Sequence, residues 1–311
     1  MQKITLPNGL TVSNICLGTM MFGTAVSESD AFAVLDAYRD RGGCFLDTAN
    51  NYSHWIGTGD ESELLLGKWL RQRRCRDRMI LATKVGYDRK GKGAGLRKEQ
   101  IEHWCDESLR KLGTDYLDLY YAHTDDPATP MEETMEAFDS LVRKGKVRFL
   151  GSSNFDTWRL VEAENVTEKH GFTGYTVHQQ HFTYLHPRME IAPQFKFNEP
   201  VGRERLRYLC ARNLPLVSYS CLLHGAYERD DRLSDEYIAG DRLAFVRKMA
   251  REKGVTASAL VVAWMCALHR CADFHRVIPL FSASKVEYFL KNLEGGDLML
   301  TGEELACLNR A

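Results

Sequence analysis

The sequence predicts one α/β domain of the (β/α)8 barrel, or TIM-barrel, class, and three observations lead to this prediction. The chain has 311 residues, which suits one large α/β domain. Short apolar runs alternate with helical patterns almost from end to end. Eight such units in about 250 residues match a closed parallel barrel, and no run is followed by the G-x-G-x-x-G turn of a doubly wound sheet. We therefore expect a single domain over residues 1–311.

The predicted strands are eight short runs rich in Val, Ile, Leu, Tyr and Phe. Such runs are typical of strands that are buried on both faces of a parallel sheet. A helix after each strand implies parallel pairing with right-handed crossovers. In chain order the runs are SNICLG, GCFLDT, RMILATK, YLDLYYAH, VRFLGSS, YTVHQQ, LPLVSYS and RVIPLFS.

Amphipathic stretches between these runs are the predicted helices, and their ends carry recognisable signals. Ser27 or Ser29 can cap the first helix, and Pro130 suits the first position of the fourth. Gly113 and Gly145 follow the third and fourth helices, where glycine commonly ends a helix. The predicted ranges are 29–41, 61–71, 97–112 and 130–144.

Two segments interrupt the alternation, His186–Gly202 and His224–Gly240. Both are long, polar and rich in turn-forming residues. Long loops in a compact domain are usually functional, and many of them cover a site. The first holds Phe195 and Phe197 in a polar setting, which suggests a lid, with an ordinary long loop as the alternative.

Composition and charge restrict the classes of partner. The formal net charge of −1 gives no reason to expect nucleic acid or an acidic membrane surface. The longest strongly apolar stretch, Ala257–Leu268, is shorter than the roughly 20 residues that span a bilayer. The opening MQKITLPNGL lacks the basic start and apolar run of a signal peptide. We expect a cytoplasmic, monomeric protein that acts on a small molecule.

The nine cysteines are predicted to be reduced structural thiols. Their count is odd, no C-x-x-C pair occurs, and most lie in apolar surroundings, where a free cysteine behaves as a small core residue. No H-x-H or H-x-x-E-H spacing indicates a metal site. They are Cys16, Cys44, Cys75, Cys105, Cys210, Cys221, Cys266, Cys271 and Cys307.

Four ionisable residues are expected to meet at one face of the barrel. The site of such a barrel lies at the carboxyl ends of its strands. Asp47 ends the second predicted strand, and Tyr52 lies in the loop after it. Lys84 ends the third strand, and His123 ends the fourth. An acid, a phenol, an amine and an imidazole therefore converge.

These four groups are suited to proton transfer. A phenol has a reference pKa of about 10, but an adjacent ammonium stabilises its phenolate, and a carboxylate can hold that ammonium in place. Asp47 and Lys84 would thus make Tyr52 a general acid. A neutral His123 could orient and polarise a substrate carbonyl. The set contains no reductant, so it requires a hydride donor.

Each residue also has a purely structural interpretation. Asp47 and Lys84 by themselves could be a buried ion pair, since ion-pair networks also perturb pKa values. Tyr52 alone could be a packing tyrosine, and His123 a core histidine. Their joint position at successive strand ends favours catalysis.

The chain resembles the aldo-keto reductase superfamily from Leu17 to Leu293. The resemblance implies that Asp47, Tyr52, Lys84 and His123 are the catalytic tetrad of a carbonyl reductase. The matching stretches are LGTMMFG, FLDTANNY, ILATKVG, LYYAHTDD, RFLGSSNF, VHQQHF, LVSYSCLLHG and IPLFSASKVEYFLKNL.

The resemblance also implies the cofactor NADP(H) and the residues that hold it. Those at the nicotinamide end would be Gly18, Thr19, Met20, Asp47, Ser153, Asn154, Gln179 and Tyr219, the last stacking on the ring. Those around the pyrophosphate and adenosine would be Ser220, Leu222, Gly225, Ser282, Ser284, Lys285 and Asn292.

Lys285 is the expected partner of the adenosine 2′-phosphate, with an exposed solvated lysine as its structural alternative. Two neighbouring positions depart from the pattern of family members that prefer NADP(H). Tyr288 stands where an arginine or glutamine is usual, and Lys291 stands at an acidic position before Asn292. The strength of the preference for NADP over NAD therefore stays open.

The substrate is expected to be a small carbonyl compound held between side chains that follow the first, second and fourth strands. Phe22 and Trp55 offer apolar surface, and His123 would hold the carbonyl. His54, Asp125 and Asp126 could bind hydroxyl groups. These polar groups suggest a keto-sugar or another polar carbonyl, although they could equally be solvated loop residues.

Two other functions are compatible with parts of this pattern. A cofactor-binding regulatory subunit with slow or no turnover could share the fold, but the intact tetrad favours an enzyme. A metal-dependent barrel hydrolase would also use His and Asp at strand ends. His178 and His181 flank the end of the sixth strand, yet Gln179 between them fits the cofactor pattern better.

Overall fold

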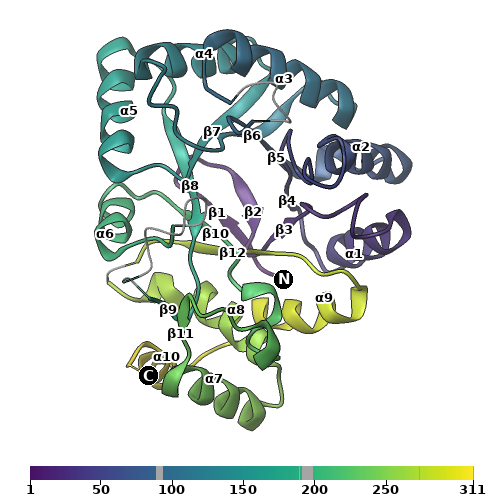
Figure 1. Ribbon diagram of the computed structural model, residues 1–311, viewed down its shortest axis with the longest axis vertical. Helices are drawn as coiled ribbons and strands as arrows, with labels where there is room; N and C mark the ends of the chain where they lie inside the picture. Colours follow the sequence, from purple (N-terminus) through teal and green to yellow (C-terminus); the bar gives the residue numbers. More distant parts are fainter. Residues whose placement is uncertain (89–93, 189, 191–198, 273, 311) are drawn as a thin grey trace. The chain divides into compact units, whose positions relative to one another are not determined.

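The computed structural model describes residues 1–88, 94–188, 190, 199–272 and 274–310 (Figure 1). Eight parallel strands form a closed barrel in the order β10-β12-β3-β4-β5-β6-β7-β8, which confirms the predicted fold class. Each predicted strand overlaps one of them. Their bounds are β3 Cys16–Gly18, β4 Phe45–Asp47, β5 Ile80–Val85, β6 Leu117–Ala122, β7 Val147–Ser153, β8 Tyr175–His181, β10 Leu216–Tyr219 and β12 Val277–Phe281.

Backbone contacts divide the chain into two compact units. The first unit comprises Met1–Cys16, Asp40–Gly43 and Gln179–Ala311, and the second comprises Leu17–Arg39 and Cys44–His178. Each unit buries its own apolar side chains, including Leu46, Leu81 and Leu119 in the second unit. The single domain over residues 1–311 remains a prediction.

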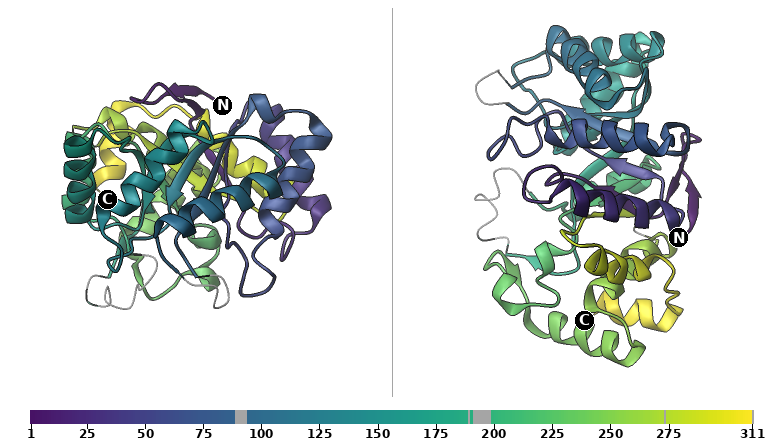
Figure 2. Two further views of the ribbon diagram at one scale, coloured as in Figure 1. Left: turned by 90° about the horizontal axis from the view of Figure 1, so that it is seen from above. Right: turned by 90° about the vertical axis from the view of Figure 1, so that its right-hand side faces the viewer.

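In the second unit, consecutive helices pack against one another outside the strands (Figures 1 and 2). α2 contacts α3, α3 contacts α4, and α4 contacts α5. Gly67 lets α2 approach α3 closely, because a Cβ there would lie 2.3 Å from the Lys111 carbonyl oxygen. The bounds are α1 Glu28–Asp40, α2 Glu61–Arg73, α3 Lys98–Leu112, α4 Met131–Arg143 and α5 Thr157–His170.

The helix signals read from the sequence are largely confirmed. The Ser27 hydroxyl accepts a hydrogen bond from the Asp30 amide at 3.2 Å, as an N-cap does. Gly113 and Gly145 both have left-handed backbones, with φ of 66° and 72°. Pro130, however, is the N-cap of α4 rather than its first helical residue. The helix starts one position later because the Pro130 backbone is extended, with ψ of 134°.

In the first unit, the buried helix α8 is central to the packing. It contacts α7, α9, α10 and β12, and most of its residues are buried. Within the described ranges, no helix combines the length and apolar character needed to cross a membrane. The helices are α6 Arg203–Ala211, α7 Gly240–Lys253, α8 Ala257–Ala267, α9 Val286–Leu293 and α10 Gly302–Arg310.

An N-terminal hairpin was not predicted. β1 (Lys3–Thr5) and β2 (Thr11–Ser13) pair antiparallel, and Gly9 between them has a φ of 87°. Asn8-Gly9 between two β-rich runs is a strong hairpin signal. The hairpin therefore has a clear basis in the sequence.

The two long loops are joined to each other in the first unit. β9 (His186–Pro187) in the first loop pairs antiparallel with β11 (Tyr237–Ile238) in the second. The Arg188 amide also donates to the Glu236 carbonyl at 2.8 Å. Residues 191–198, which include Phe195 and Phe197, lie outside the described residues, so the lid remains a prediction.

All nine cysteines are free thiols, as expected. Burial raises the pKa of Cys105 to about 12, which keeps that thiol protonated and unreactive. In the part of the chain that the structure describes, no group of three or more His, Cys, Asp or Glu residues could hold a metal ion.

Candidate active site

Strand register in the second unit brings the predicted catalytic residues to one edge. β4 and β5 pair in parallel, with Asp47 opposite Ala82, so Asp47 and Lys84 lie near the carboxyl ends of neighbouring strands. In the β5–β6 pair, Lys84 lies opposite Tyr121, and His123 follows the last residue of β6. Parallel pairing therefore places all three groups at the same edge of the sheet, where the strands have their carboxyl ends.

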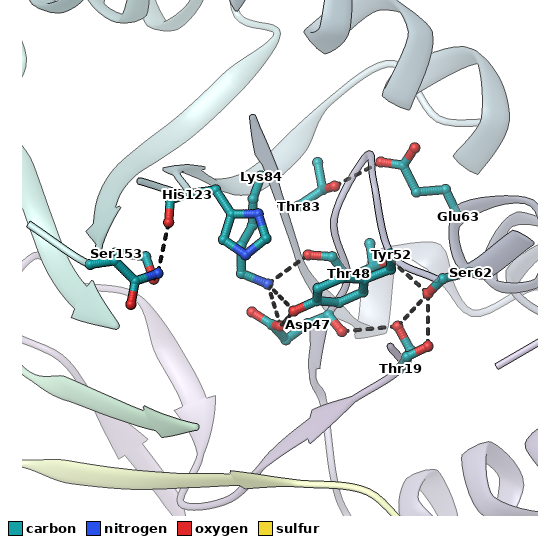
Figure 3. Close-up of polar contacts among 11 residues, drawn as sticks. Thr19, Asp47, Thr48, Tyr52, Ser62, Glu63, Thr83, Lys84, His123 and Ser153 are labelled. Carbon is teal, nitrogen blue, oxygen red and sulfur yellow. Dashed lines mark hydrogen bonds and ion pairs between the residues drawn. The ribbon is translucent and has the colours of Figure 1, made fainter. Parts of the chain in front are cut away.

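The Lys84 ammonium is the centre of this group (Figure 3). It donates to Asp47 Oδ1 at 2.5 Å, to the Tyr52 hydroxyl at 2.6 Å and to the Thr48 carbonyl oxygen at 2.8 Å. The side chains of Lys84 and Asp47 are both 0% exposed. Tyr52 also donates its hydroxyl proton to Asp47 Oδ1 at 3.0 Å. An ammonium has three protons, and all three have acceptors here.

His123 stands beside Tyr52 as a neutral imidazole. The two rings meet edge to face, with centroids 5.9 Å apart. Burial, and secondly the charge of Lys84, holds the pKa of His123 well below its usual value. A neutral imidazole carries one N–H donor, which is what a carbonyl oxygen requires.

Tyr87 is a neighbour of His123 that sequence reasoning missed. Its ring lies edge to face with the imidazole at a centroid distance of 4.7 Å. Burial raises the pKa of the Tyr87 phenol, so it stays protonated at neutral pH. A usable signal was present, because Tyr87 follows Lys84 by three residues in the loop after β5.

Asn154 ties the end of β7 to the end of β6. Its side-chain amide donates to the His123 carbonyl oxygen at 2.9 Å and to the Ser153 hydroxyl at 3.1 Å. Its backbone is left-handed, with a φ of 58°, a conformation that asparagine tolerates better than most residues. Ser153 is fully buried, and Gln179, one of the last residues of β8, is 2% exposed.

The predicted residues after β3 already have partners in the second unit. Gly18 ends β3, and the Thr19 amide and hydroxyl both donate to the Asp47 carbonyl oxygen, at 3.0 and 2.9 Å. The Met20 carbonyl oxygen accepts from the Ser53 hydroxyl at 2.5 Å. The Met20 side chain is 37% exposed.

In the first unit, the segment after β10 has an unusual backbone. Ser220, Leu223 and His224 all have positive φ, between 47° and 54°, and Gly225 follows with 98°. Leu222 precedes Leu223 with φ −104° and ψ 8°. A right-handed residue followed by a left-handed one can form a nest of amides that binds anions. This conformation fits the pyrophosphate segment that the resemblance implied.

Tyr219 ends β10, and its ring meets His181 edge to face, with centroids 5.7 Å apart. Tyr219 is half-buried.

The residues expected near the adenosine lie between β12 and the end of α9. Lys285 is the N-cap residue of α9 and is exposed, as are Ser282 and Ser284. A helix N-terminus favours a phosphate group because its amides and dipole are positive. Asn292 is in the last turn, about 10 Å from Lys285 along the helix axis.

The predicted substrate residues differ in what they offer. Phe22 is 0% exposed and presents no accessible surface, whereas Trp55 is 53% exposed. His54 Nδ1 lies 3.0 Å from the Asn51 carbonyl oxygen, and its ring contacts Trp55 edge to face at 5.3 Å.

Asp125 is already engaged in an ion pair. The Arg159 Nε donates to both Asp125 oxygens, at 3.0 and 2.8 Å. The Arg159 side chain is 7% exposed and the Asp125 side chain 15%. A substrate hydroxyl would have to compete with a well-buried guanidinium for this carboxylate.

Comparison with known proteins agrees with this arrangement. The model of the Aldo/keto reductase family matches residues 14–311. The chain is 40% identical over 194 residues to the "Uncharacterized oxidoreductase YrpG" of Bacillus subtilis, covering 60% of this chain and 59% of that relative. It is 29% identical to a norsolorinic acid reductase of Aspergillus flavus, covering 96% and 77%. It is 28% identical to a relative named as an aryl-alcohol dehydrogenase, AAD14, of Saccharomyces cerevisiae, covering 96% and 83%.

The family match spans nearly the whole chain, including every strand of the closed barrel and the Asp47–Lys84–Tyr52 group. The aligned part of YrpG is less than two thirds of that protein, while the other two relatives align over most of their lengths. The chain therefore belongs to the aldo/keto reductase family, whose members are oxidoreductases that generally use nicotinamide cofactors.

Proposed function

We propose that this protein reduces an aldehyde or ketone to an alcohol with NADPH, and that Tyr52 is the proton donor. The observation that carries the proposal is the position of the Tyr52 hydroxyl, 2.6 Å from the Lys84 ammonium and 3.0 Å from Asp47 Oδ1. An ion-paired lysine next to a phenol allows the phenol to give up its proton at neutral pH. A bound reduced nicotinamide would supply the hydride.

Each residue of the tetrad has a distinct part in this proposal. Tyr52 gives its proton to the carbonyl oxygen as the carbonyl carbon accepts the hydride pair. The Lys84 ammonium stabilises the phenolate that remains, and Asp47 holds the ammonium in place. His123 donates its N–H to the same carbonyl oxygen and so orients the substrate.

The residues proposed to hold NADP(H) have suitable chemistry in each unit. The amide and hydroxyl groups of Ser153, Asn154 and Gln179 would bind the carboxamide, and Tyr219 would stack on the ring. The left-handed segment that includes Ser220, Leu222 and Gly225 offers amides to a pyrophosphate. The backbone at Gly18–Met20 would line the reactive end. Ser282, Ser284, Lys285 and Asn292 would meet the adenosine end, and Lys285 at the start of α9 supports NADP.

For the substrate we favour an aromatic carbonyl over a keto-sugar. Asp125, which was expected to bind hydroxyl groups, is paired with Arg159. Tyr87 adds an aromatic ring next to His123, and Trp55 adds an exposed one. A relative named for aryl-alcohol oxidation supports the same choice. An aromatic aldehyde should therefore have a higher kcat/KM than a keto-sugar of similar size. The reverse order would favour the polar substrate that was expected from the sequence.

The regulatory-subunit alternative remains distinct from this proposal, because family membership alone does not specify the rate of turnover. The single domain, the monomeric state and the cytoplasmic location also remain predictions from the sequence. Direct measurement of turnover separates the enzyme from the regulator.

The test is the rate of NADPH oxidation with an aromatic aldehyde, for the wild type and for Tyr52→Phe. We expect the variant to lose about 10²- to 10⁴-fold in kcat, the usual contribution of a general acid, while NADPH binding is retained. Tyr116→Phe is the matched control, because its ring contacts Arg76 and Arg148 in the second unit and takes no part in the tetrad. Equal turnover of wild type and Tyr52→Phe would refute the mechanism.

A further inference from the structure

The first turn of α2 lies next to the tetrad and contributes two polar side chains to its surroundings (Figure 3). Ser62 and Glu63 are consecutive residues and both are 0% exposed. A buried polar group is costly unless it is hydrogen-bonded, so the partners of these two residues are informative.

Ser62 connects the ends of β3 and β4 through hydroxyl groups. Its Oγ lies 2.8 Å from Thr19 Oγ1 and 2.8 Å from Thr48 Oγ1, and it donates to the Thr19 carbonyl oxygen at 2.9 Å. Thr19 Oγ1 in turn donates to the Asp47 carbonyl oxygen at 2.9 Å. All three hydroxyl-bearing residues are fully buried.

Counting protons gives this network a direction. Each hydroxyl has one proton. The Ser62 proton is directed to Thr19, where it reaches the carbonyl oxygen, and the Thr19 hydroxyl proton goes to the Asp47 carbonyl oxygen, so the proton between Ser62 and Thr48 comes from Thr48. The Thr48 hydroxyl is thus bound to Ser62, Ser62 to the Thr19 carbonyl oxygen, and the Thr19 hydroxyl to the Asp47 carbonyl oxygen. The network holds the Thr48 side chain and the Asp47 backbone, so it restrains two consecutive residues.

Asp47 and Thr48 supply two of the three acceptors of the Lys84 ammonium. Asp47 provides Oδ1 at 2.5 Å, and Thr48 provides its carbonyl oxygen at 2.8 Å. The third acceptor is the Tyr52 hydroxyl at 2.6 Å. A shift of the Asp47–Thr48 backbone would therefore move the ammonium relative to Tyr52.

Glu63 contacts the strand that carries Lys84, the second member of the Asp47–Lys84 ion pair. Its Oε1 accepts from the Thr83 hydroxyl at 2.7 Å, and Thr83 directly precedes Lys84. Its Oε2 faces Lys111 Nζ at 3.4 Å. The α2 helix can serve as a rigid reference because Gly67 packs it against the α3 backbone.

We propose that Ser62 and Glu63 are positioning residues that hold the Asp47 and Lys84 strand ends in the register that places the Lys84 ammonium on the Tyr52 hydroxyl. Ser62 fixes the Asp47–Thr48 backbone, and Glu63 fixes Thr83. This inference rests on the proposed function for its catalytic consequence, but its geometric content can be tested without turnover.

The first experiment compares Ser62→Ala with Ser108→Ala. Ser108 is a serine of α3 in the same unit that is also 0% exposed, and among the described residues its hydroxyl has no hydrogen-bond partner. We expect Ser62→Ala to lower kcat about tenfold, a barrier change of about 1.4 kcal/mol, with less than twofold change in KM for NADPH. Ser108→Ala should stay within about twofold of wild type in both constants.

The second readout is the pH midpoint at which Tyr52 ionises. It is measured by ultraviolet difference titration, in which each protein is compared with the same protein carrying Tyr52→Phe. A looser Lys84 stabilises the phenolate less, so the midpoint should rise by about half a pH unit in Ser62→Ala. A residue that only supports folding would lower the melting temperature without moving this midpoint.

A second pair of variants keeps the test decisive if Ser62→Ala does not fold. Thr48→Val preserves the shape of the side chain but cannot donate to Ser62, whereas Thr48→Ser keeps the hydroxyl. We expect the valine variant to reproduce the loss in kcat and the higher Tyr52 midpoint, and the serine variant to restore both.

The outcomes separate this inference from the proposed function. If the wild type reduces carbonyls but Ser62→Ala and Thr48→Val match Ser108→Ala in kcat and in the Tyr52 midpoint, the positioning role is wrong. If the wild type shows no turnover but the midpoint still rises in both variants, the positioning role stands and the reductase proposal fails.

Discussion

Two buried clusters in this protein treat ionisable side chains in opposite ways. In the second unit, Lys84 and Asp47 are fully buried and meet as an ion pair at 2.5 Å. In the first unit, His181 is 2% exposed and its Nε2 lies 2.9 Å from the hydroxyl of Tyr237. Burial, with a smaller contribution from His224, lowers the pKa of His181 to about 4.

The difference shows what a buried ionisable group needs in order to carry a charge. Removal from water disfavours the charged form, and only an opposite charge or several hydrogen bonds compensate. Lys84 has a carboxylate and two further acceptors. His181 meets a neutral phenol and is therefore a neutral ring at physiological pH. The first cluster holds a charged ammonium that can support proton transfer, while the second is a neutral hydrogen-bonded contact.

The structure held by His181 is the junction of the two long loops. Its carbonyl oxygen accepts from the Val201 amide at 2.8 Å. Its ring stacks on Tyr237, with centroids 5.9 Å apart and planes inclined by 19°. Tyr237 belongs to β11, which pairs with β9. His181 thus contacts both loops, the first through its backbone carbonyl oxygen and the second through its neutral side chain.

The largest effect is expected from breaking the charged cluster with Lys84→Met. Turnover should disappear, and the free energy of unfolding should fall by about 3–5 kcal/mol, because Asp47 is left buried without its partner. Urea denaturation measures the loss.

The double variant Asp47→Asn/Lys84→Met tests the cause of that loss. It removes the uncompensated charge and should recover most of the stability without recovering turnover. If the double variant were no more stable than Lys84→Met, the loss would come from packing rather than from charge. Unchanged turnover in Lys84→Met would reduce the lysine to a structural ion pair.

A smaller effect is expected from acid on the neutral cluster. An unfolded histidine has a pKa of about 6.5, and folded His181 about 4, so between these values the unfolded chain binds more protons. The contribution of neutral His181 to the free energy of unfolding is therefore complete above pH 6.5. It is lost as the pH falls towards 4, by up to about 3 kcal/mol. His181→Gln should lose less stability between pH 7 and pH 4.5 in urea titrations. Parallel curves for the two proteins would contradict the assignment, since His123 contributes equally to both.

The smallest effect is expected from Tyr237→Phe, which removes a single hydrogen bond from the neutral cluster. The ring stays, but His181 Nε2 loses its partner while remaining buried. The unfolding free energy should fall by about 1–2 kcal/mol, as for other unsatisfied buried groups. Thermal unfolding measures it, with Tyr116→Phe as the control. A loss below that of the control would mean that the hydroxyl contributes nothing to this junction.

The barrel and the tetrad could be predicted from the sequence because both depend on local patterns and on one general rule. Apolar runs of strand length appear at eight places, and each overlaps a barrel strand. Parallel strands put their carboxyl ends at the same edge, so Asp47, Lys84 and His123 could be expected together before any contact was known. The N-terminal hairpin also follows from a local pattern, Asn8-Gly9 between two β-rich runs.

Contacts between side chains far apart in sequence could not be predicted in this way. Ser62 meets Thr19 across 43 positions, and Arg159 meets Asp125 across 34. Nothing in the residues around Ser62 distinguishes a buried linker from an exposed helix start. Such pairs depend on how each helix sits over its strands, which the pattern of apolar residues leaves undetermined.

By itself, the sequence determined the fold class, the order of the strands along the chain and the chemical groups at their ends. Only the tertiary structure decided which of those groups are charged, paired or neutral. The physical reason is that charge state depends on burial and on the nearest partner. Both quantities exist only after packing has brought α2 to Thr48 and Thr83, Arg159 to Asp125, and Tyr237 to His181.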